Sequence, residues 1–269
     1  MINWIIPENG VGWSSINVLD YIKEKTGNDN ARISYKYIPG SLNVNYRTLL
    51  EIPDNIEILN LPKNILRVAE KKTFRLTVRK LLPQYSPKIY LLRQHFLKFP
   101  IIVRPDQHQQ GRDFKILKSY DELKTLPVKY THGIEIIYPN IEYRVICARK
   151  FNNEIIVLSF KRKEITYKED NNQENWLRNV KPKNYSLGRS VFKWIERCEG
   201  KDEIKSAAIE AFKLSELHFG ACDVLYDTER KKPFVIEINS RFASESSSLI
   251  RLMGNYIINY EKDYLNQER

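Results

Sequence analysis

The chain is poor in the residues that build disulfide frameworks and zinc sites. It has three cysteines in 269 residues, Cys147, Cys198 and Cys222, and none of them forms a CxxC pair. An odd number of cysteines without such a pair argues against a disulfide framework and a cysteine-ligated zinc site, and it favours a reducing, cytoplasmic location. The four histidines are scattered, without the HExxH grouping of a zinc protease.

Long apolar runs are missing as well. No window approaches the run of about 18 apolar residues that a membrane-spanning helix requires, so we expect no membrane partner. The stretch MINWIIPENG has neither the charged region nor the long apolar region of a signal peptide. The sequence also contains no Cys–His or GxSxG arrangement, which are signatures of covalent nucleophilic catalysis.

Positive charge is what the chain has in excess. Lysine and arginine number 44 against 33 acidic residues, which gives a formal net charge of +11. Such an excess favours a polyanionic partner, for example a nucleotide, a nucleic acid or an acidic protein. A lysine-rich translation of an AT-rich genome has the same composition, so the charge alone does not decide between these explanations.

Periodic patterns predict a small α/β unit at the N-terminus. An apolar strand over residues 2–7 is followed by a helix over residues 16–27 and by strands over residues 31–38 and 56–61. A longer helical pattern then covers residues 64–82.

The remainder mixes further strands with helices. We expect strands within residues 99–117, 132–139, 141–150, 154–164, 221–227 and 233–239. Helices are expected over YDELKTL and over residues 201–219 and 247–265, and the polar stretch 166–190 is expected to be a long loop.

The strongest chemical signal is a predicted hairpin near the C-terminus. In FVIEINSRFA, residues 234–243, strand alternation places Phe234, Ile236 and Ile238 on one face. The other face then carries Glu237 and Asn239.

A turn near Arg230 sets Asp223 directly opposite Glu237, seven residues away on either side. Two opposed carboxylates repel each other, and a hard cation such as Mg²⁺ would cancel that repulsion with Asn239 as a neutral oxygen ligand. A solvated sheet face whose carboxylates happen to align is the alternative.

This strand–hairpin–strand pattern resembles the ATP-grasp superfamily of carboxylate–amine ligases. The resemblance rests on FGACDVLYD and KKPFVIEINSR, and it extends upstream through KFPIIVRPDQHQQGRDFKIL and HGIEIIYPNIEYRV. It implies an α/β (α+β) class with an ATP-grasp fold in which two α+β subdomains clasp ATP. The implied domains are a small α/β domain at 1–63 and a grasp domain at 64–269, divided into a nucleotide-covering part (64–137) and a metal- and substrate-binding part (138–269).

The resemblance also implies ligands for ATP and for Mg²⁺. Asp223, Glu237 and Asn239 correspond to the residues that hold two Mg²⁺ ions, for which Mn²⁺ is an alternative. Arg75 and Arg104 stand where the family has phosphate-binding lysines. Arginine keeps the charge but adds a bidentate fork. The implied nucleotide-binding set is Arg75, Arg104, Gly111, Glu135, Ile136, Ile137, Glu142 and Lys161.

Within that set, Gly111 lies in the phosphate-covering loop. Glu135, Ile136 and Ile137 lie in the strand that contacts adenine, and Glu142 is at the position that binds the ribose. Arg144 and Arg162 are the implied catalytic residues, which steady the substrate carboxylate and the acyl-phosphate oxyanion.

The implied reaction is ATP-dependent amide-bond formation through an acyl phosphate. The partner is then a small molecule or peptide with a carboxylate and an amine, and the loop at 166–190 resembles that of enzymes that attach amino acids to peptides and proteins. After Asn239 the family often has SPG, where this chain has Ser240, Arg241 and Phe242, so the substrate stays open.

Two other functions stay open. The first is a nucleic-acid-binding module with a degenerate nucleotide site, suggested by the charge and by YSPKIYLLRQHF. The second is an ATP-dependent phosphotransferase on the same scaffold. An acidic macromolecule or a nucleic acid therefore stays open as a partner.

Overall fold

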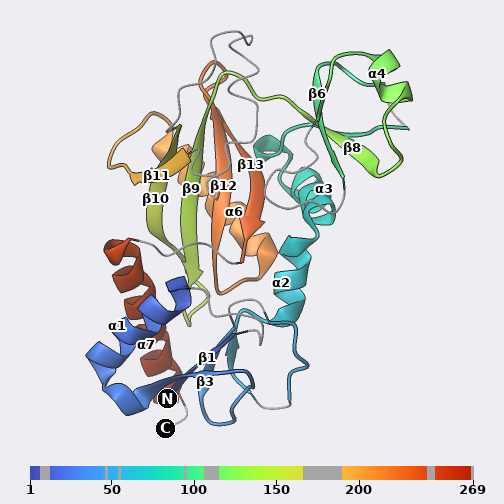
Figure 1. Cartoon of the computed structure of the whole chain (residues 1–269). Helices are drawn as coiled ribbons and strands as arrows, with labels where there is room; N and C mark the ends of the chain where they lie inside the picture. Colours follow the sequence, from blue (N-terminus) through green and yellow to red (C-terminus); the bar gives the residue numbers. More distant parts are fainter. Residues whose placement is uncertain are drawn as a thin grey trace.

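The computed structural model describes residues 1–6, 13–45, 48–53, 56–93, 96–105, 115–165, 190–240 and 246–267. Three sheets follow one another along the chain, and we call them the N-terminal, central and C-terminal sheets. Figure 1 shows the N-terminal sheet below the five-stranded C-terminal sheet, with the central sheet to one side. No helix in the described ranges is long and apolar enough to cross a membrane.

The N-terminal sheet is parallel and has the order β2-β1-β3-β4. Its strands are β1 (Ile2–Ile5), β2 (Ala31–Ser34), β3 (Leu42–Asn45) and β4 (Ile58–Leu59). Helix α1 (Trp13–Thr26) joins β1 to β2 and ends where Gly27 takes a φ of +95°, which glycine adopts without strain. A short 3₁₀ turn (Asn28–Asn30) precedes β2.

Strand β3 was missing from the sequence prediction because LNVN carries two asparagines. The Asn43 side chain makes its own turn, accepting from the Ile38 amide (2.9 Å) and donating to the Ser41 carbonyl (2.9 Å). Such local bonds usually compete with strand formation. Here they stabilise the turn over residues 38–41, just before β3 begins.

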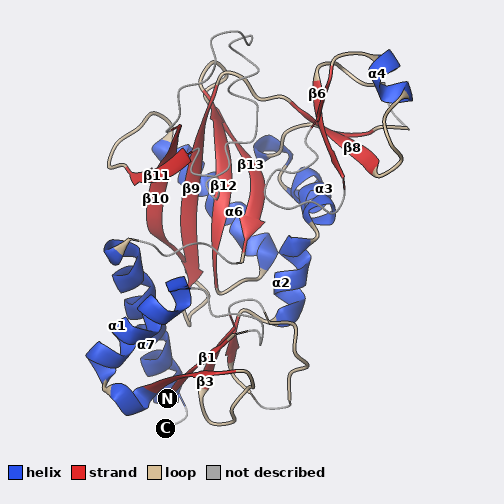
Figure 2. Ribbon diagram, viewed as in Figure 1, coloured by secondary structure: helices blue, strands red, loops and turns tan. Residues whose placement is uncertain are grey.

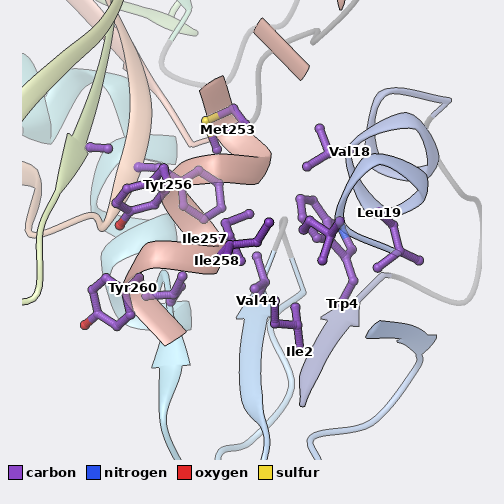
Figure 3. Close-up of a cluster of buried hydrophobic side chains, with 14 of the residues drawn as sticks. Ile2, Trp4, Val18, Leu19, Val44, Met253, Tyr256, Ile257, Ile258 and Tyr260 are labelled. Atoms are coloured by element: carbon purple, nitrogen blue, oxygen red, sulfur yellow. The ribbon is translucent and has the colours of Figure 1, made fainter. Parts of the chain in front are cut away.

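The last helix and the first strand share one hydrophobic core. Figure 3 shows side chains of α7 (Ser247–Gln267), such as Ile257, facing those of α1 and of the N-terminal sheet, whereas Tyr256 points to the other side. The Tyr256 hydroxyl donates to the carbonyls of Arg149 (2.8 Å) and His218 (3.0 Å). The same cluster includes Phe219 and Ala221 of the C-terminal sheet. The N-terminal sheet is therefore packed against the base of the C-terminal sheet, although the domain boundary at residue 63 stays a prediction.

Two helices replace the single helix expected over residues 64–82. Helix α2 (Pro62–Ala69) and helix α3 (Lys71–Leu81) are separated at Glu70, whose φ of −76° and ψ of 71° are not helical. The break places the start of α3 at the edge of the C-terminal sheet, where Arg75 donates to the backbone of β13.

The central sheet is antiparallel and has the order β5-β8-β6-β7. Its strands are β5 (Ile89–Leu91), β6 (Ile101–Pro105), β7 (Lys115–Leu117) and β8 (Tyr130–Glu135), with the turn η2 (Pro83–Tyr85) before β5 and helix α4 (Tyr120–Lys124) after β7. Ile101 and Val103 face a core on one side of this sheet. Alternation therefore places Arg104 on the other side.

The C-terminal sheet is antiparallel and has the order β11-β10-β9-β12-β13. Its strands are β9 (Asn140–Arg149), β10 (Ile155–Ile165), β11 (Ser190–Trp194), β12 (Phe219–Asp227) and β13 (Lys232–Asn239). Helix α6 (Lys201–Ser215) covers one face, as Figure 2 shows, and packs there on a second core. The opposite face carries the charged residues described below.

Asn60 joins the N-terminal sheet to strand β12. Its side-chain oxygen accepts from the amides of His218 (2.7 Å) and Phe219 (3.1 Å), and its Nδ2 donates to the Phe219 carbonyl (3.1 Å). Asn60 is fully buried and has a φ of +65°, a conformation that asparagine tolerates better than most residues.

Replacing Asn60 should destabilise the protein. Asn60→Gly keeps the backbone conformation but loses three buried hydrogen bonds, and we expect a loss of about 3 kcal/mol in urea unfolding. Asn60→Ala should lose about 1 kcal/mol more, because alanine is strained at this φ. Asn153→Gly is the control, since Asn153 has a similar φ of +66° in an exposed turn. Equal stability of all three variants would contradict the role of Asn60.

The neighbouring histidine predicts a pH dependence of stability. His218 Nδ1 accepts from the Asn60 amide (3.0 Å), and burial together with the positive charge of Arg149 lowers the pKa of His218 to about 4. The unfolded chain binds this proton near pH 6.5, so stability should be lost as pH falls from about 6.5 to about 4, by at most about 3 kcal/mol. Urea unfolding across this range should show a smaller dependence in His218→Gln, and an unchanged dependence would refute the assignment.

Candidate functional site

The hairpin of β12 and β13 has the predicted register at the carboxylates. Asp223 pairs directly with Glu237, and Ala221 pairs with Asn239. A β-bulge follows, because Val224 pairs with Val235 and leaves Ile236 as the extra residue. The predicted apolar face is wrong beyond the bulge. Val235 joins Ile238 in the core beneath α6, whereas Phe234 lies outside that cluster.

The three predicted metal ligands contact one another. Asn239 Nδ2 donates to Glu237 Oε1 (3.1 Å) and to Asp223 Oδ2 (3.3 Å). Each carboxylate also pairs with a positively charged side chain. Arg144 holds Asp223 through two hydrogen bonds of 2.7 Å, from Nε and Nη2, and Lys71 Nζ lies 2.7 Å from Glu237 Oε2.

The two carboxyl groups respond in opposite ways to this environment. Burial raises the pKa of Asp223, and the charges of Glu237 and Glu142 act in the same direction against the opposing effect of Arg144. Burial also acts to raise the pKa of Glu237, but Lys71, Arg75 and Asn239 outweigh it and hold that pKa well below its usual range. Glu237 therefore stays ionised at neutral pH.

The donor set fits a hard divalent cation. Two carboxylates and one amide oxygen are ligands that Mg²⁺ accepts, usually with substrate phosphates completing its shell. Within the described part of the chain, no group of three or more His, Cys, Asp and Glu side chains could hold a metal ion, so an amide is needed as the third protein ligand here. The side chains of Arg144 and Lys71 now neutralise the two opposed carboxylates. A bound metal ion would supply positive charge in the same place.

Two largely buried arginines lie beside the carboxylates. Arg75 is 6% exposed, donates from Nε to the Ile236 carbonyl (2.9 Å) and approaches Glu237 Oε2 at 4.0 Å. Burial and the neighbouring Arg104 lower the pKa of Arg75 to about 10, with Glu237 opposing. Burial likewise lowers the pKa of Arg104, against the effects of Glu237 and Glu142. Both side chains remain cationic at neutral pH, so two positive charges adjoin the carboxylates.

Strands β9 and β10 add further charges to the same face. Lys161 pairs in register with Arg144, and its Nζ donates to Ser246 Oγ (3.4 Å). Lys163 Nζ lies 2.7 Å from Glu142 Oε1. The Arg144 guanidinium also lies 4.2 Å from the centre of the Phe192 ring, which fixes its plane.

Arg162 does not join this group. Its register partner is Tyr143, which is buried in the core beneath α6, and its Nη2 binds Glu164 Oε1 at 2.8 Å. Neighbouring residues on a strand face opposite sides of the sheet. Arg162 therefore faces the α6 side, whereas Lys161 and Lys163 face the opposite side. Lys163, and not Arg162, therefore lies on the face that carries the predicted metal ligands.

The predicted adenine-contacting residues, Glu135, Ile136 and Ile137, lie where the chain passes from β8 to β9, and we call this segment the hinge. The Glu135 carboxylate accepts from the Lys88 amide (3.0 Å) and binds Arg230 Nη1 (2.9 Å). Ile137 is buried, and Ile136 lines a pocket discussed below. Gly111, most of the loop at 166–190 and the Arg241–Phe242 segment lie outside the described residues.

Sequence reasoning missed Lys71, Lys163 and Phe192 as site residues. Lys71 follows the helix break at Glu70, which periodicity did not reveal, and Phe192 lies on a short strand within a polar region. Lys163 stands in FKRK, where only strand register distinguishes the three cations.

Comparison with solved structures gives full-length similarity. D-alanine–D-alanine ligase from Bacillus anthracis has a TM-score of 0.62 at 13% identity, covering 99% of each chain. The ATP-grasp ligase PsnB, complexed with minimal precursor, Mg and ADP, has a TM-score of 0.65 at 13% identity, covering 96% of this chain and 97% of PsnB.

An L-amino acid ligase from Bacillus licheniformis has a TM-score of 0.54 at 11% identity, over 97% of this chain and 76% of that one. No protein-family model matches the sequence, and no curated protein matches it. The predicted fold class is confirmed by the structural similarity: the chain has the ATP-grasp fold.

Proposed function

We propose that the protein is an ATP-dependent carboxylate–amine ligase that works through an acyl phosphate. One observation carries this proposal. The directly opposed Asp223 and Glu237, with Asn239 between them, lie beside the buried cations Arg75 and Arg104. A cation-binding group and an anion-binding wall thus adjoin, as a metal-bound triphosphate requires. The structures named above are called ligases, which supports the reaction class.

The residues of the site have distinct proposed roles. Arg75, Arg104 and Lys71 bind the phosphates, Glu142 binds the ribose, and the backbone of Ile136 and Ile137 contacts adenine. Asp223, Glu237 and Asn239 would hold two Mg²⁺ ions, or Mn²⁺ in their place. When bound, these ions neutralise charge on the phosphate oxygens. The Glu135 carboxylate already binds the Lys88 amide and the Arg230 guanidinium, so the hinge contacts adenine through its backbone and not through this side chain.

The reaction proceeds in two displacements. A substrate carboxylate oxygen attacks the γ-phosphorus of ATP, and ADP leaves. An amine nitrogen then attacks the acyl carbon of the acyl phosphate, inorganic phosphate leaves, and the amine loses a proton as the amide forms. Arg144, held by Asp223 and Phe192, is oriented to steady the carboxylate, and Lys161 and Lys163 face the transferred phosphoryl group.

The proposed substrates are an amino acid and a peptide, protein or other amine that accepts it. ADP release that requires an amine acceptor separates this reaction from a phosphotransferase, which needs no amine. Screening amino acids and peptides for ADP release, with mass spectrometry of the product, tests the proposal directly. ADP release without any new C–N bond under all conditions would refute it.

Removing a metal ligand should abolish turnover without unfolding the protein. Glu237→Gln preserves shape but removes one charge from the cation site, so we expect Mg²⁺-dependent ADP release to fall by at least about 100-fold. Glu164→Gln is the matched control on the opposite face of the sheet and should retain activity within about twofold. Wild-type turnover in Glu237→Gln would remove this residue from the metal site.

Replacing Lys163 should lower catalysis much more than replacing its neighbour Arg162 on β10. Lys163→Ala removes a charge from the cleft face and should lower kcat/KM by at least about tenfold, whereas Arg162→Ala should change it less than about twofold. Steady-state ADP-release assays on both variants, with matched unfolding midpoints, make the comparison. The opposite ranking would restore Arg162 as the catalytic candidate.

A further inference from the structure

A pocket beside the hinge that joins the central and C-terminal sheets is rich in cations, and we call it the basic pocket. Its volume is about 510 Å³, within the range of small-ligand sites. Its cations are Arg79, Lys88, Lys98, Arg230 and Lys232, and its one carboxylate is Glu135. Five positive charges against one negative charge leave a net charge of +4.

The basic pocket is separate from the phosphate- and metal-binding residues. Glu135 pairs in register with Ile101, whose side chain belongs to the core of the central sheet. Tyr90 and Phe99, which also line the basic pocket, pack against the same core. Arg104 faces the other side of that sheet, and none of the proposed metal ligands lines the basic pocket.

Most of these cations have no ionic partner in the described part of the chain. Arg230 binds Glu135 and Asp227, whereas no described carboxylate pairs with Lys88, Lys98 or Lys232. Like charges gathered around a concave surface repel one another, and an anionic ligand relieves that repulsion. The charge pattern therefore selects an acidic occupant.

The surrounding strands favour a peptide over a nucleic acid. Strand β5 is an edge strand of the central sheet and contributes Tyr90 to the basic pocket, whereas the edge of β13 is partly covered by Arg75 of α3. Edge strands offer backbone groups to an extended chain. The ring of Phe234 is approached by Lys232 at 5.6 Å and by Arg230 at 5.9 Å, and Phe99 meets Tyr120 edge to face at 4.8 Å. Phe234 and Phe99 thus already contact other side chains, which limits the stacking of nucleic-acid bases on these two rings.

We propose that the basic pocket binds an extended acidic peptide segment, with its carboxylates on Lys88, Lys98 and Lys232 and its backbone along β5. This makes the pocket a docking site apart from the proposed metal- and phosphate-binding residues, on the side of the hinge away from Arg104. The inference does not depend on the ligase reaction, because binding alone tests it.

The test measures fluorescence anisotropy of a labelled peptide that alternates glutamate and valine, titrated with the full chain. A peptide with glutamine in place of glutamate and a labelled oligothymidylate are the comparison probes. The pocket variant carries Lys98→Glu with Lys232→Glu. The control variant carries Lys25→Glu with Lys213→Glu, two exposed helix positions that give the same change in net charge.

We expect the glutamate peptide to bind, the glutamine peptide not to bind, and the pocket variant to weaken binding by at least about tenfold. The control variant should weaken it less than about twofold. Equal weakening in both variants would show non-specific attraction and overturn the proposal, as would the absence of peptide binding. Oligothymidylate binding that is tighter than peptide binding and lost in the pocket variant would overturn it in favour of a nucleic acid.

Discussion

The opposed carboxylates of Asp223 and Glu237 are the constraint that the rest of the site satisfies. Like charges on directly paired strand positions destabilise a sheet, and burial raises that cost. The cations that offset it come from different elements: Arg144 from β9 in the same sheet, and Lys71 from α3 outside it. The ion pair between Lys71 and Glu237 therefore holds helix α3 against the hairpin. This contact also positions Arg75, one helical turn further along α3, where it binds the backbone of β13.

This arrangement explains why the buried arginines suit a phosphate ligand. Arg75 and Arg104 repel each other, and burial removes the water that would screen them. Glu237 and Glu142 compensate them only in part, and both carboxylates already bind lysines. A polyanion entering beside them meets charges that are already desolvated and oriented, so little reorganisation is needed on binding. Arginine in place of lysine adds a planar fork that can also hold backbone carbonyls, as Arg75 does.

The sequence revealed the hairpin because its signal is local. A short charged turn fixes the pairing of the two strands, and the polar residues at 223, 237 and 239 interrupt otherwise apolar strands. It did not reveal the bulge at Ile236, the break at Glu70 or the side of the sheet on which Arg162 lies. The last two depend on contacts between distant segments: β9 sets the register of β10, and β13 binds Lys71 at the start of α3. The short strands β5 and β11 were missed because their three and five residues carry too little periodicity, whereas the two asparagines of β3 concealed it.

The structure also bears on the origin of the positive charge. A compositional bias scatters lysines over the surface, where pairs such as Lys150–Glu154 and Lys124–Asp121 contribute little to stability. It does not account for buried cations, because removing a charge from water costs several kcal/mol unless partners compensate it. Arg75 binds the backbone of β13, Arg104 lies within electrostatic reach of Glu237, and Arg144 spans both oxygens of Asp223. Composition is thus sufficient for the exposed lysines, whereas the buried arginines require a local reason, and an anionic substrate beside a cation site supplies one.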